Sequence, residues 1–192
     1  MDFIRNNFSE TTRLIDSFLN DTDNCTNLEK AIKLIAEKHK NGYKGLVCGN
    51  GGSACDAMHY AEELTGRFRK DRKALPAISL TDASHITCVG NDYGFEYIFS
   101  RGVEAFGCEN DYLIAISTSG NSPNVIKAVE AAKDRKMLTV GLLGKDGGLL
   151  KDMVDFSFIV KAETSDRIQE VHILIIHTLI EGIERELFKE NY

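Results

Sequence analysis

The sequence predicts an α/β fold built on a parallel sheet, and two features of the chain predict it. Five short apolar runs have the length and composition of buried strands, at residues 46–48, 77–80, 113–116, 140–143 and 156–160. Helical patterns separate them, notably at 53–67 and 123–136, and a long one follows the last run at 166–189. Such alternation is typical of a parallel sheet covered by helices on both faces.

The first forty residues precede this alternation and are predicted to be helical. A first apolar stripe consists of Phe3, Ile4, Phe8, Leu14, Ile15, Phe18 and Leu19, and a second of Leu28, Ala31, Ile32, Ile35 and Ala36. Asn41 and Gly42 end the second helix. With 192 residues, two prolines and no linker-like stretch, we expect one domain over 1–192, with a helical segment at 1–41 and an α/β core at 44–192.

Composition excludes several classes of protein. Lys plus Arg number 23 against 29 Asp plus Glu, a net charge of −6, which argues against a nucleic-acid binder. No apolar stretch approaches the ~20 residues needed to span a bilayer, so no membrane association is expected. The polar N-terminus lacks the apolar run of a signal peptide, so we expect a cytoplasmic protein.

The cysteines agree with a reducing compartment. There are five, an odd number, and none forms a C-x-x-C pair. Disulfide scaffolds and thiolate zinc sites both have tighter, paired spacings. We expect most of the five to be small buried apolar residues without a catalytic role.

Two strand ends carry Gly/Ser-rich turns that open directly into helices, at 48–53 and at 117–123. In the second turn, Ser122 suits the N-cap and Pro123 the first helical position. Glycines allow a close backbone approach to an anion, and free N–H groups at a helix start point towards it. Tight turns with capping serines are the simpler interpretation, but hydroxyl-dense turns at two strand ends favour a phosphate site.

A dinucleotide site is the competing interpretation of the first turn. Gly49-x-Gly51-x-x-Ala54 matches the loose dinucleotide fingerprint at a strand end. That fingerprint expects an acidic residue ~20 positions on, where Arg69 stands, and the next predicted strand ends only at Asp82. No Walker A sequence is present either, so neither nucleotide motif is supported.

Candidate acid–base and metal-binding residues lie on the helices that follow these turns. His59 and Glu63 are spaced i,i+4 and share a helix face. His177 lies in an apolar stretch of the C-terminal helix, where a buried imidazole needs a partner, and Gln169 lies two turns earlier. Two imidazoles and a carboxylate suit Zn²⁺, and the same groups can move protons beside a carbonyl.

Other polar residues receive simpler interpretations. His39 and His172 have no comparable setting and are expected at the surface. The basic run 67–73 is expected to be a solvated loop, although Arg67, nearest Glu63, could reach an anionic substrate.

Together these motifs resemble those of the sugar isomerase (SIS) domain family and, within it, of the bacterial phosphoheptose isomerases. The resemblance covers nearly the whole chain and is densest at 48–53, 56–67, 89–95, 116–122 and 167–172. The hydroxyl-rich segment Ser117-Thr118-Ser119-Gly120-Asn121-Ser122 is common to many SIS proteins. The combination of His59-x-x-x-Glu63 with Gln169 and His177 is more specific.

The resemblance implies a three-layer sandwich with a five-stranded parallel sheet, assembled as a homotetramer with active sites at subunit interfaces. It implies conversion of sedoheptulose 7-phosphate to D-glycero-D-manno-heptose 7-phosphate through an enediol, the first step of ADP- and GDP-heptose precursor biosynthesis. Glu63 would be the base and His177 the acid/base at the oxygens.

The resemblance also implies the ligands. One Zn²⁺ per subunit would be bound by His59, Glu63, Gln169 and His177. The sugar phosphate would be held by Asn50, Gly51, Gly52, Ser53, Glu63, Arg67, Asn91, Asp92, Ser117, Thr118, Ser119, Ser122, Asp166 and Gln169. The connection at 160–166 differs from longer versions in some relatives and could shape substrate preference.

Two alternatives within the SIS fold remain open at this point. A non-catalytic SIS protein could bind a replication-initiator partner, although it would have no need to keep His59, Glu63, Gln169 and His177 together. An SIS enzyme or regulator could instead act on an amino-sugar phosphate.

Overall fold

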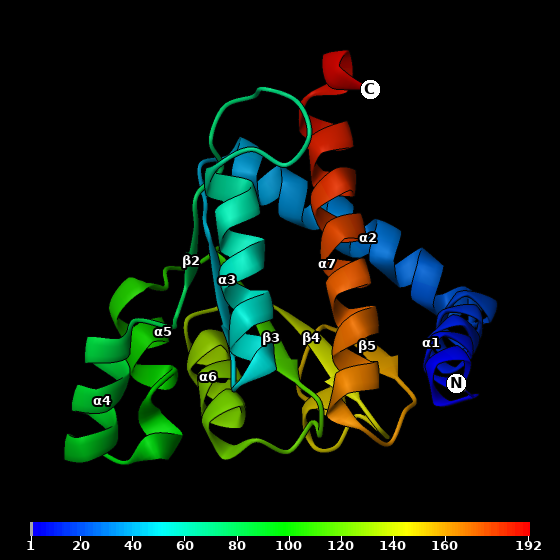
Figure 1. Ribbon diagram of the computed structural model, residues 1–192. Coiled ribbons are helices and arrows are strands. Elements are labelled where there is room, and N and C mark those ends of the chain that lie inside the picture. The colour runs from blue at the N-terminus through cyan, green and yellow to red at the C-terminus, as the bar shows by residue number, and fades with distance from the viewer. Residues whose placement is uncertain (1) are drawn as a thin grey trace.

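The computed structural model describes residues 2–192, and its five strands form one parallel sheet (Figure 1). The strands are β1 (Gly45–Gly49), β2 (Ala77–Ser79), β3 (Tyr112–Ser117), β4 (Leu138–Gly144) and β5 (Phe156–Val160). Their order across the sheet is β2-β1-β3-β4-β5. The chain therefore adds strands to one side of β1 and then to the other, so a topological switch point lies between the carboxyl ends of β1 and β3.

Helices cover both faces of the sheet. They are α1 (Asp2–Asn20), α2 (Thr22–Lys40), α3 (Gly52–Thr65), α4 (Ala83–Asp92), α5 (Ser100–Phe106), α6 (Pro123–Asp134) and α7 (Ser165–Leu187). Short 3₁₀ turns lie at Phe95–Tyr97, Leu150–Asp152 and Lys189–Asn191. All five predicted strands and the three predicted core helices are present, with ends shifted by one or a few residues.

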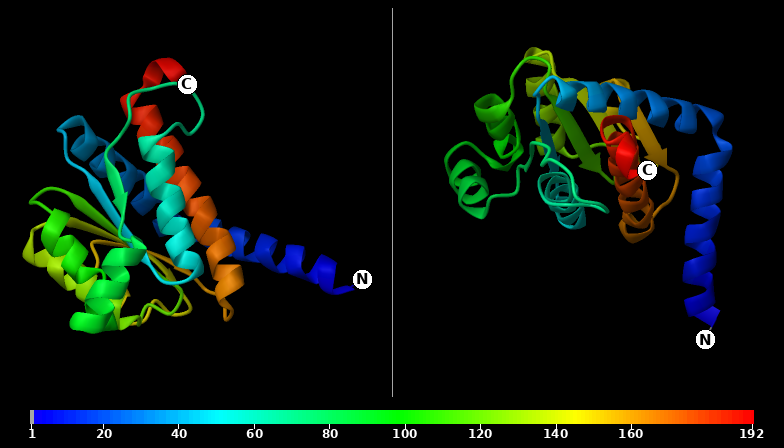
Figure 2. Two further views of the ribbon diagram at one scale, coloured as in Figure 1. Left: turned by 60° about the vertical axis from the view of Figure 1, so that its left-hand side comes forward. Right: turned by 90° about the horizontal axis from the view of Figure 1, so that it is seen from above.

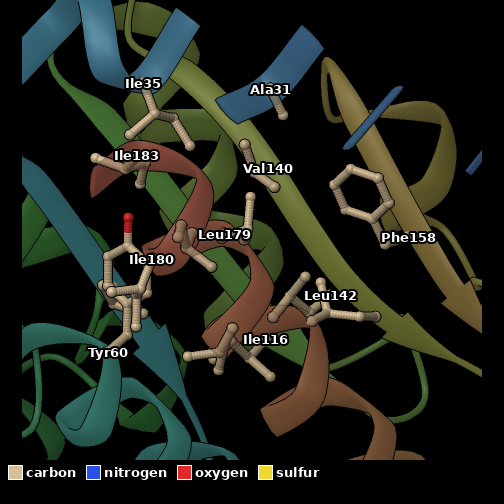
Figure 3. Packing of buried hydrophobic residues seen from close by; sticks show 14 of the residues in the cluster. Ala31, Ile35, Tyr60, Ile116, Val140, Leu142, Phe158, Leu179, Ile180 and Ile183 are labelled. Carbon is tan, nitrogen blue, oxygen red and sulfur yellow. The ribbon is translucent and has the colours of Figure 1, made fainter. Parts of the chain in front are cut away.

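The core has two halves because alternate residues of a strand point to opposite faces. On one face, α2, α3 and α7 pack against strand residues that include Ile116, Val140 and Phe158 (Figure 3). On the other face, α4, α5 and α6 pack against a set that includes Leu113 and Ala115. These halves and the sheet between them form the predicted three layers.

Helix α1 stands apart from this body. Figure 2 shows it extending away from the layers, and Phe18 is its only buried residue among those described. Phe3 and Phe8 are 69% and 75% exposed. Since an isolated helix of this length is marginal in water, this apolar face needs a partner surface.

Two histidines predicted at the surface are buried, which makes that prediction wrong. The Nε2 atom of His39 lies 2.8 Å from the Tyr112 hydroxyl, and Nε2 of His172 lies 2.9 Å from the carbonyl oxygen of Leu143. Each ring packs on the sheet side of its helix and has one polar partner. That hydrogen bond reduces the free-energy cost of burying the imidazole. Burial lowers the pKa of both imidazoles to about 4.

The cysteine prediction is also wrong for most positions. Only Cys48, within β1, is buried, whereas Cys25, Cys55, Cys88 and Cys108 are exposed. Burial raises the pKa of the Cys48 thiol to about 12. Over residues 2–192, no helix is long and apolar enough to cross a bilayer.

Candidate active site

The loop after β1 begins the site at the switch point. A side chain at Gly49 would lie 2.8 Å from the Cβ of Ser53, and Gly51 has φ +57°, so both positions require glycine. This backbone turns sharply into α3, whose first turn contains the buried Ser53. The N–H groups at this helix start have no side-chain cap, which leaves them available to an anion.

The loop after β3 presents the hydroxyl groups predicted to hold phosphate. Ser117 Oγ and Ser122 Oγ lie 3.0 Å apart, and Thr118 Oγ1 lies 3.0 Å from Ser165 Oγ at the start of α7. Gly120 has φ +65°, and a Cβ there would meet the carbonyl oxygen of Gly147 at 1.9 Å. Ser122 is the N-cap residue of α6, as predicted, but its hydroxyl does not bond a helix N–H, so the amides of the first turn keep their donors.

A reciprocal amide pair joins these two loops. Asn50 Nδ2 donates to Asn124 Oδ1, and Asn124 Nδ2 donates to Asn50 Oδ1, both at 2.8 Å. Asn124 is buried in the first turn of α6. Sequence reasoning missed Asn124, and the only available signal was its place directly after the N-terminal proline of a phosphate-loop helix.

The acid–base and metal candidates meet between α3 and α7. His59 Nε2 lies 3.3 Å from Glu63 Oε1 and 3.3 Å from His177 Nε2, and one ligand atom of each residue lies within 4.8 Å of the others. All three side chains are partly buried. The sequence predicts this grouping, although 118 positions separate His59 from His177.

This donor set fits Zn²⁺. Two ligands at about 2.0–2.1 Å from a tetrahedral ion lie ~3.3–3.4 Å apart, which matches both distances from His59 Nε2.

The surroundings keep His177 suited to such a role. Burial, followed by the neighbouring His59 and then Arg69, lowers the pKa of His177, which favours the neutral ring that a metal requires. The Phe68 ring lies 5.8 Å from the His177 ring, centroid to centroid. Phe68, another residue that sequence reasoning missed, shields this side of the cluster.

Gln169 lies at the other end of the same helix pair. Its Nε2 atom lies 3.4 Å from Ser53 Oγ, and a Cβ at Gly52 would come within 2.6 Å of its Oε1 atom. The side chain therefore packs against the start of α3, beside the first phosphate loop. No contact among the described residues joins it to His59, Glu63 or His177.

The remaining predicted site residues, Arg67, Asn91, Asp92 and Asp166, are exposed. Asp166 follows Ser165 in the first turn of α7, and hydrogen bonds from Thr164 and its own helix start lower its pKa. Arg67 lies in the loop after α3 and forms no ion pair with any described residue. Asn91 and Asp92 end α4, and Asn91 Nδ2 donates to Asp92 Oδ1 at 2.7 Å. No contact among the described residues joins Asn91 or Asp92 to the His59 cluster.

One further polar group was missed by sequence reasoning. Asp56, one turn before His59, has a buried Oδ2 atom with no hydrogen-bond partner within residues 2–192. Burial raises its pKa to about 6. Its i−3 spacing from His59 was the only available signal.

The parallel sheet with a hydroxyl-rich loop at its switch point places the chain in the class of SIS-domain proteins. The model of that family, the SIS domain, matches residues 8–144 of the chain.

Comparison with individual proteins identifies a family within this class. A phosphoheptose isomerase from Fusobacterium nucleatum is 62% identical over 179 residues, 93% of this chain and 92% of that protein. One from Shigella dysenteriae is 53% identical over 98% of both chains. The solved phosphoheptose isomerase of Francisella tularensis superposes with a TM-score of 0.91 at 39% identity, covering 96% of this chain and 97% of that one. The chain belongs to the phosphoheptose isomerase family, which confirms the prediction of an isomerase.

Proposed function

We propose that this protein interconverts sedoheptulose 7-phosphate and D-glycero-D-manno-heptose 7-phosphate, the first step of ADP- and GDP-heptose precursor biosynthesis. The observation that carries the proposal is the His59, Glu63 and His177 cluster beside two phosphate-binding loops at one switch point. A sugar phosphate offers an anion for the loops and a carbonyl for the cluster. The relatives' shared name supports the heptose substrate.

The loops orient the substrate. The hydroxyl groups of Ser117, Thr118, Ser119 and Ser122 and the free amides at the start of α6 hold the phosphate. Asn50, Gly51, Gly52 and Ser53 line the neighbouring loop, and Gln169 contacts Ser53 from α7. With the phosphate anchored, C1 and C2 are held beside Glu63, which makes proton transfer effectively intramolecular.

The reaction moves two protons. Glu63 removes the proton from C1 of the ketose, an enediol forms, and the same carboxylate returns a proton to C2. His177 moves the second proton between the oxygens of C1 and C2. Because Glu63 Oε1 faces His59, its other oxygen is free for this shuttle.

One Zn²⁺ per subunit belongs to the proposal, with His59, Glu63, Gln169 and His177 as its ligands. When bound, the ion stabilises negative charge on the oxygens of C1 and C2. The donor distances described above support it.

The proposal includes a homotetramer with active sites at subunit interfaces. Exposed apolar residues on α1 and an apolar hollow between α1, α2 and α7, which includes Ile15, Leu19, Ile32 and Leu174, support association. A second subunit would also bring Asn91, Asp92 or Arg67 to a site they do not reach within one chain. The chain acts as one domain, 1–192, in the cytoplasm, where its five free cysteines would remain reduced.

Glu63→Gln tests the base. Turnover should fall ~100-fold or more, since general-base losses are of that order, while the dissociation constant for sugar phosphate changes little. Glu130→Gln is the matched control: Glu130 is an exposed carboxylate on α6 with no ion pair among the described residues, and the variant's turnover should stay within about twofold of wild type. If Glu63→Gln keeps more than about a tenth of wild-type turnover, the base assignment is wrong.

A further inference from the structure

Arg72 has a buried side chain, although it belongs to the basic run 67–73, which the sequence predicts to be a solvated loop. Its side chain is 1% exposed, and so is that of its partner Glu184 on α7. Arg72 Nε donates to Glu184 Oε1 at 2.7 Å. A buried guanidinium group requires a counter-charge and hydrogen-bond acceptors. The groups that Arg72 contacts therefore indicate its role.

Most of those acceptors belong to the end of α3. Arg72 Nη2 donates to the carbonyl oxygen of Glu63 at 2.6 Å, and Nη1 donates to those of Leu64 at 2.8 Å and Gly66 at 3.0 Å. The last carbonyls of a helix have no intrahelical partner, and a cation there also suits the helix dipole. Arg72 therefore caps the helix that contains His59 and Glu63, through the backbone of Glu63 itself.

Glu184 extends this contact to the helix that contains His177. It lies seven residues after His177, which is two turns and the same face of α7. Its second oxygen accepts a hydrogen bond from the Tyr192 hydroxyl at 2.7 Å, so the carboxylate is held from both sides. Arg72 and Glu184 thus form a bridge between the C-terminal halves of α3 and α7.

The helices lie side by side and run in the same direction (Figure 1). Polar contacts join α7 to α3 or to the loop that follows α3: Ser53 with Gln169 near the N-terminal ends, His59 with His177 in the middle, and Arg69 with Glu181 and Arg72 with Glu184 at the C-terminal ends. The middle contact is the proposed metal site. Of the two ion pairs at the C-terminal ends, the Arg72–Glu184 bridge is fully buried, whereas Arg69 is 52% exposed.

We propose that Arg72 is a positioning residue: with Glu184 it fixes α3 against α7 and thereby sets the spacing of His59 and Glu63 from His177. This inference rests on the proposed function. Groups that hold metal ligands in place typically contribute 10–100-fold to metal affinity or activity. The planar fork of arginine serves several acceptors at fixed angles, which the single ammonium of lysine does not reproduce.

Arg72→Met and Arg72→Lys test it through zinc affinity, measured by competition with a chelator, and through kcat and KM. Both variants should bind zinc at least about 10-fold more weakly and lose at least about 10-fold in kcat. KM for the sugar phosphate should change by less than about threefold, because the phosphate loops lie at the starts of α3 and α6, away from the C-terminal end of α3 that Arg72 contacts. Should Arg72→Met fail to fold, Arg72→Lys, which keeps the charge, carries the test alone.

A matched control separates positioning from stability. Val103→Ala removes buried volume in α5, on the opposite face of the sheet, and should lower the melting temperature without changing zinc affinity or kcat. Glu184→Gln keeps the acceptor for Arg72 Nε and should lose less than Arg72→Met. If the Arg72 variants only melt earlier and match wild type in zinc affinity and kcat, Arg72 is structural and the inference is wrong. If wild type neither binds zinc nor turns over sugar phosphate, the proposed function fails, and this inference with it.

Discussion

At the scale of single residues, the site depends on side chains that are held by partners before any substrate arrives. His59 has Glu63 and His177 at 3.3 Å, and Asn50 has both amide atoms bonded to Asn124. Groups that are already oriented do not lose rotamer freedom when they act, which is the physical value of such preorganisation.

Asn124→Leu tests the amide pair. Leucine has a similar volume but forms no side-chain hydrogen bond. Asn50 would therefore lose both hydrogen bonds to residue 124, and the two loops would lose the contact that joins them. An unsatisfied buried polar group costs about 1–3 kcal/mol, and we expect affinity for the sugar phosphate to fall about tenfold, with a smaller change in kcat. Isothermal titration with the sugar phosphate measures it, and an unchanged dissociation constant would show that Asn50 is oriented without Asn124.

At the scale of elements, α7 is the part that brings the site together. It contributes Ser165, Gln169 and His177 at successive levels, and His172 ties it to the end of β4 through the carbonyl oxygen of Leu143. Its apolar face packs on the sheet with α2 and α3, so the positions of its polar residues follow from the core.

The buried His172 makes stability depend on pH. Its folded-state pKa of about 4 lies below the ordinary 6.5, so the unfolded chain binds more protons between these values. The stabilisation is therefore complete above about pH 6.5 and is lost as pH falls towards 4. Between pH 7.5 and 5.0, wild type should lose about 2 kcal/mol more unfolding free energy than His172→Gln.

Denaturant titrations of both proteins at fixed protein concentration make the comparison. Other groups, including Asp56 with its raised pKa, are common to both chains and cancel in the difference. Parallel pH dependences in wild type and variant would contradict the assignment.

The periodicity of apolar residues predicted most of the helices and strands, and the chemistry of the side chains predicted much of the candidate active site. Short apolar runs defined all five strands, and His59, Glu63 and His177 were identified before their contact was visible. The helices at 83–92 and 100–106 were missed because they are short and their apolar residues, such as Val89 and Val103, are few.

Other features depend on packing that one-dimensional patterns do not contain. His39 and His172 are each buried beside one polar partner that lies far away in the sequence. Arg72 is buried because the end of α3 and Glu184, 112 positions away, surround it. The Asn50–Asn124 pair joins two loops that become neighbours only because β1 and β3 are adjacent in the sheet.

At the scale of the whole molecule, α1 presents apolar residues that its own chain does not cover. Phe3→Ser combined with Phe8→Ser should leave the fold intact, because neither side chain packs into the described core. Light scattering after size exclusion should give wild type four times the 21.4 kDa chain mass and the double variant a smaller species. A variant that remains tetrameric would show that α1 does not form the interface.

We propose that this chain isomerises a heptose phosphate by proton transfer at the His59, Glu63 and His177 cluster and that this cluster binds zinc. The most direct test of this proposal is to follow sedoheptulose 7-phosphate with purified wild-type protein by NMR, as isolated, after metal stripping by a chelator, and after zinc is returned. We expect D-glycero-D-manno-heptose 7-phosphate to form, its rate to fall on stripping and to recover with zinc. The absence of product under every metal condition would show that this protein is not a heptose-phosphate isomerase.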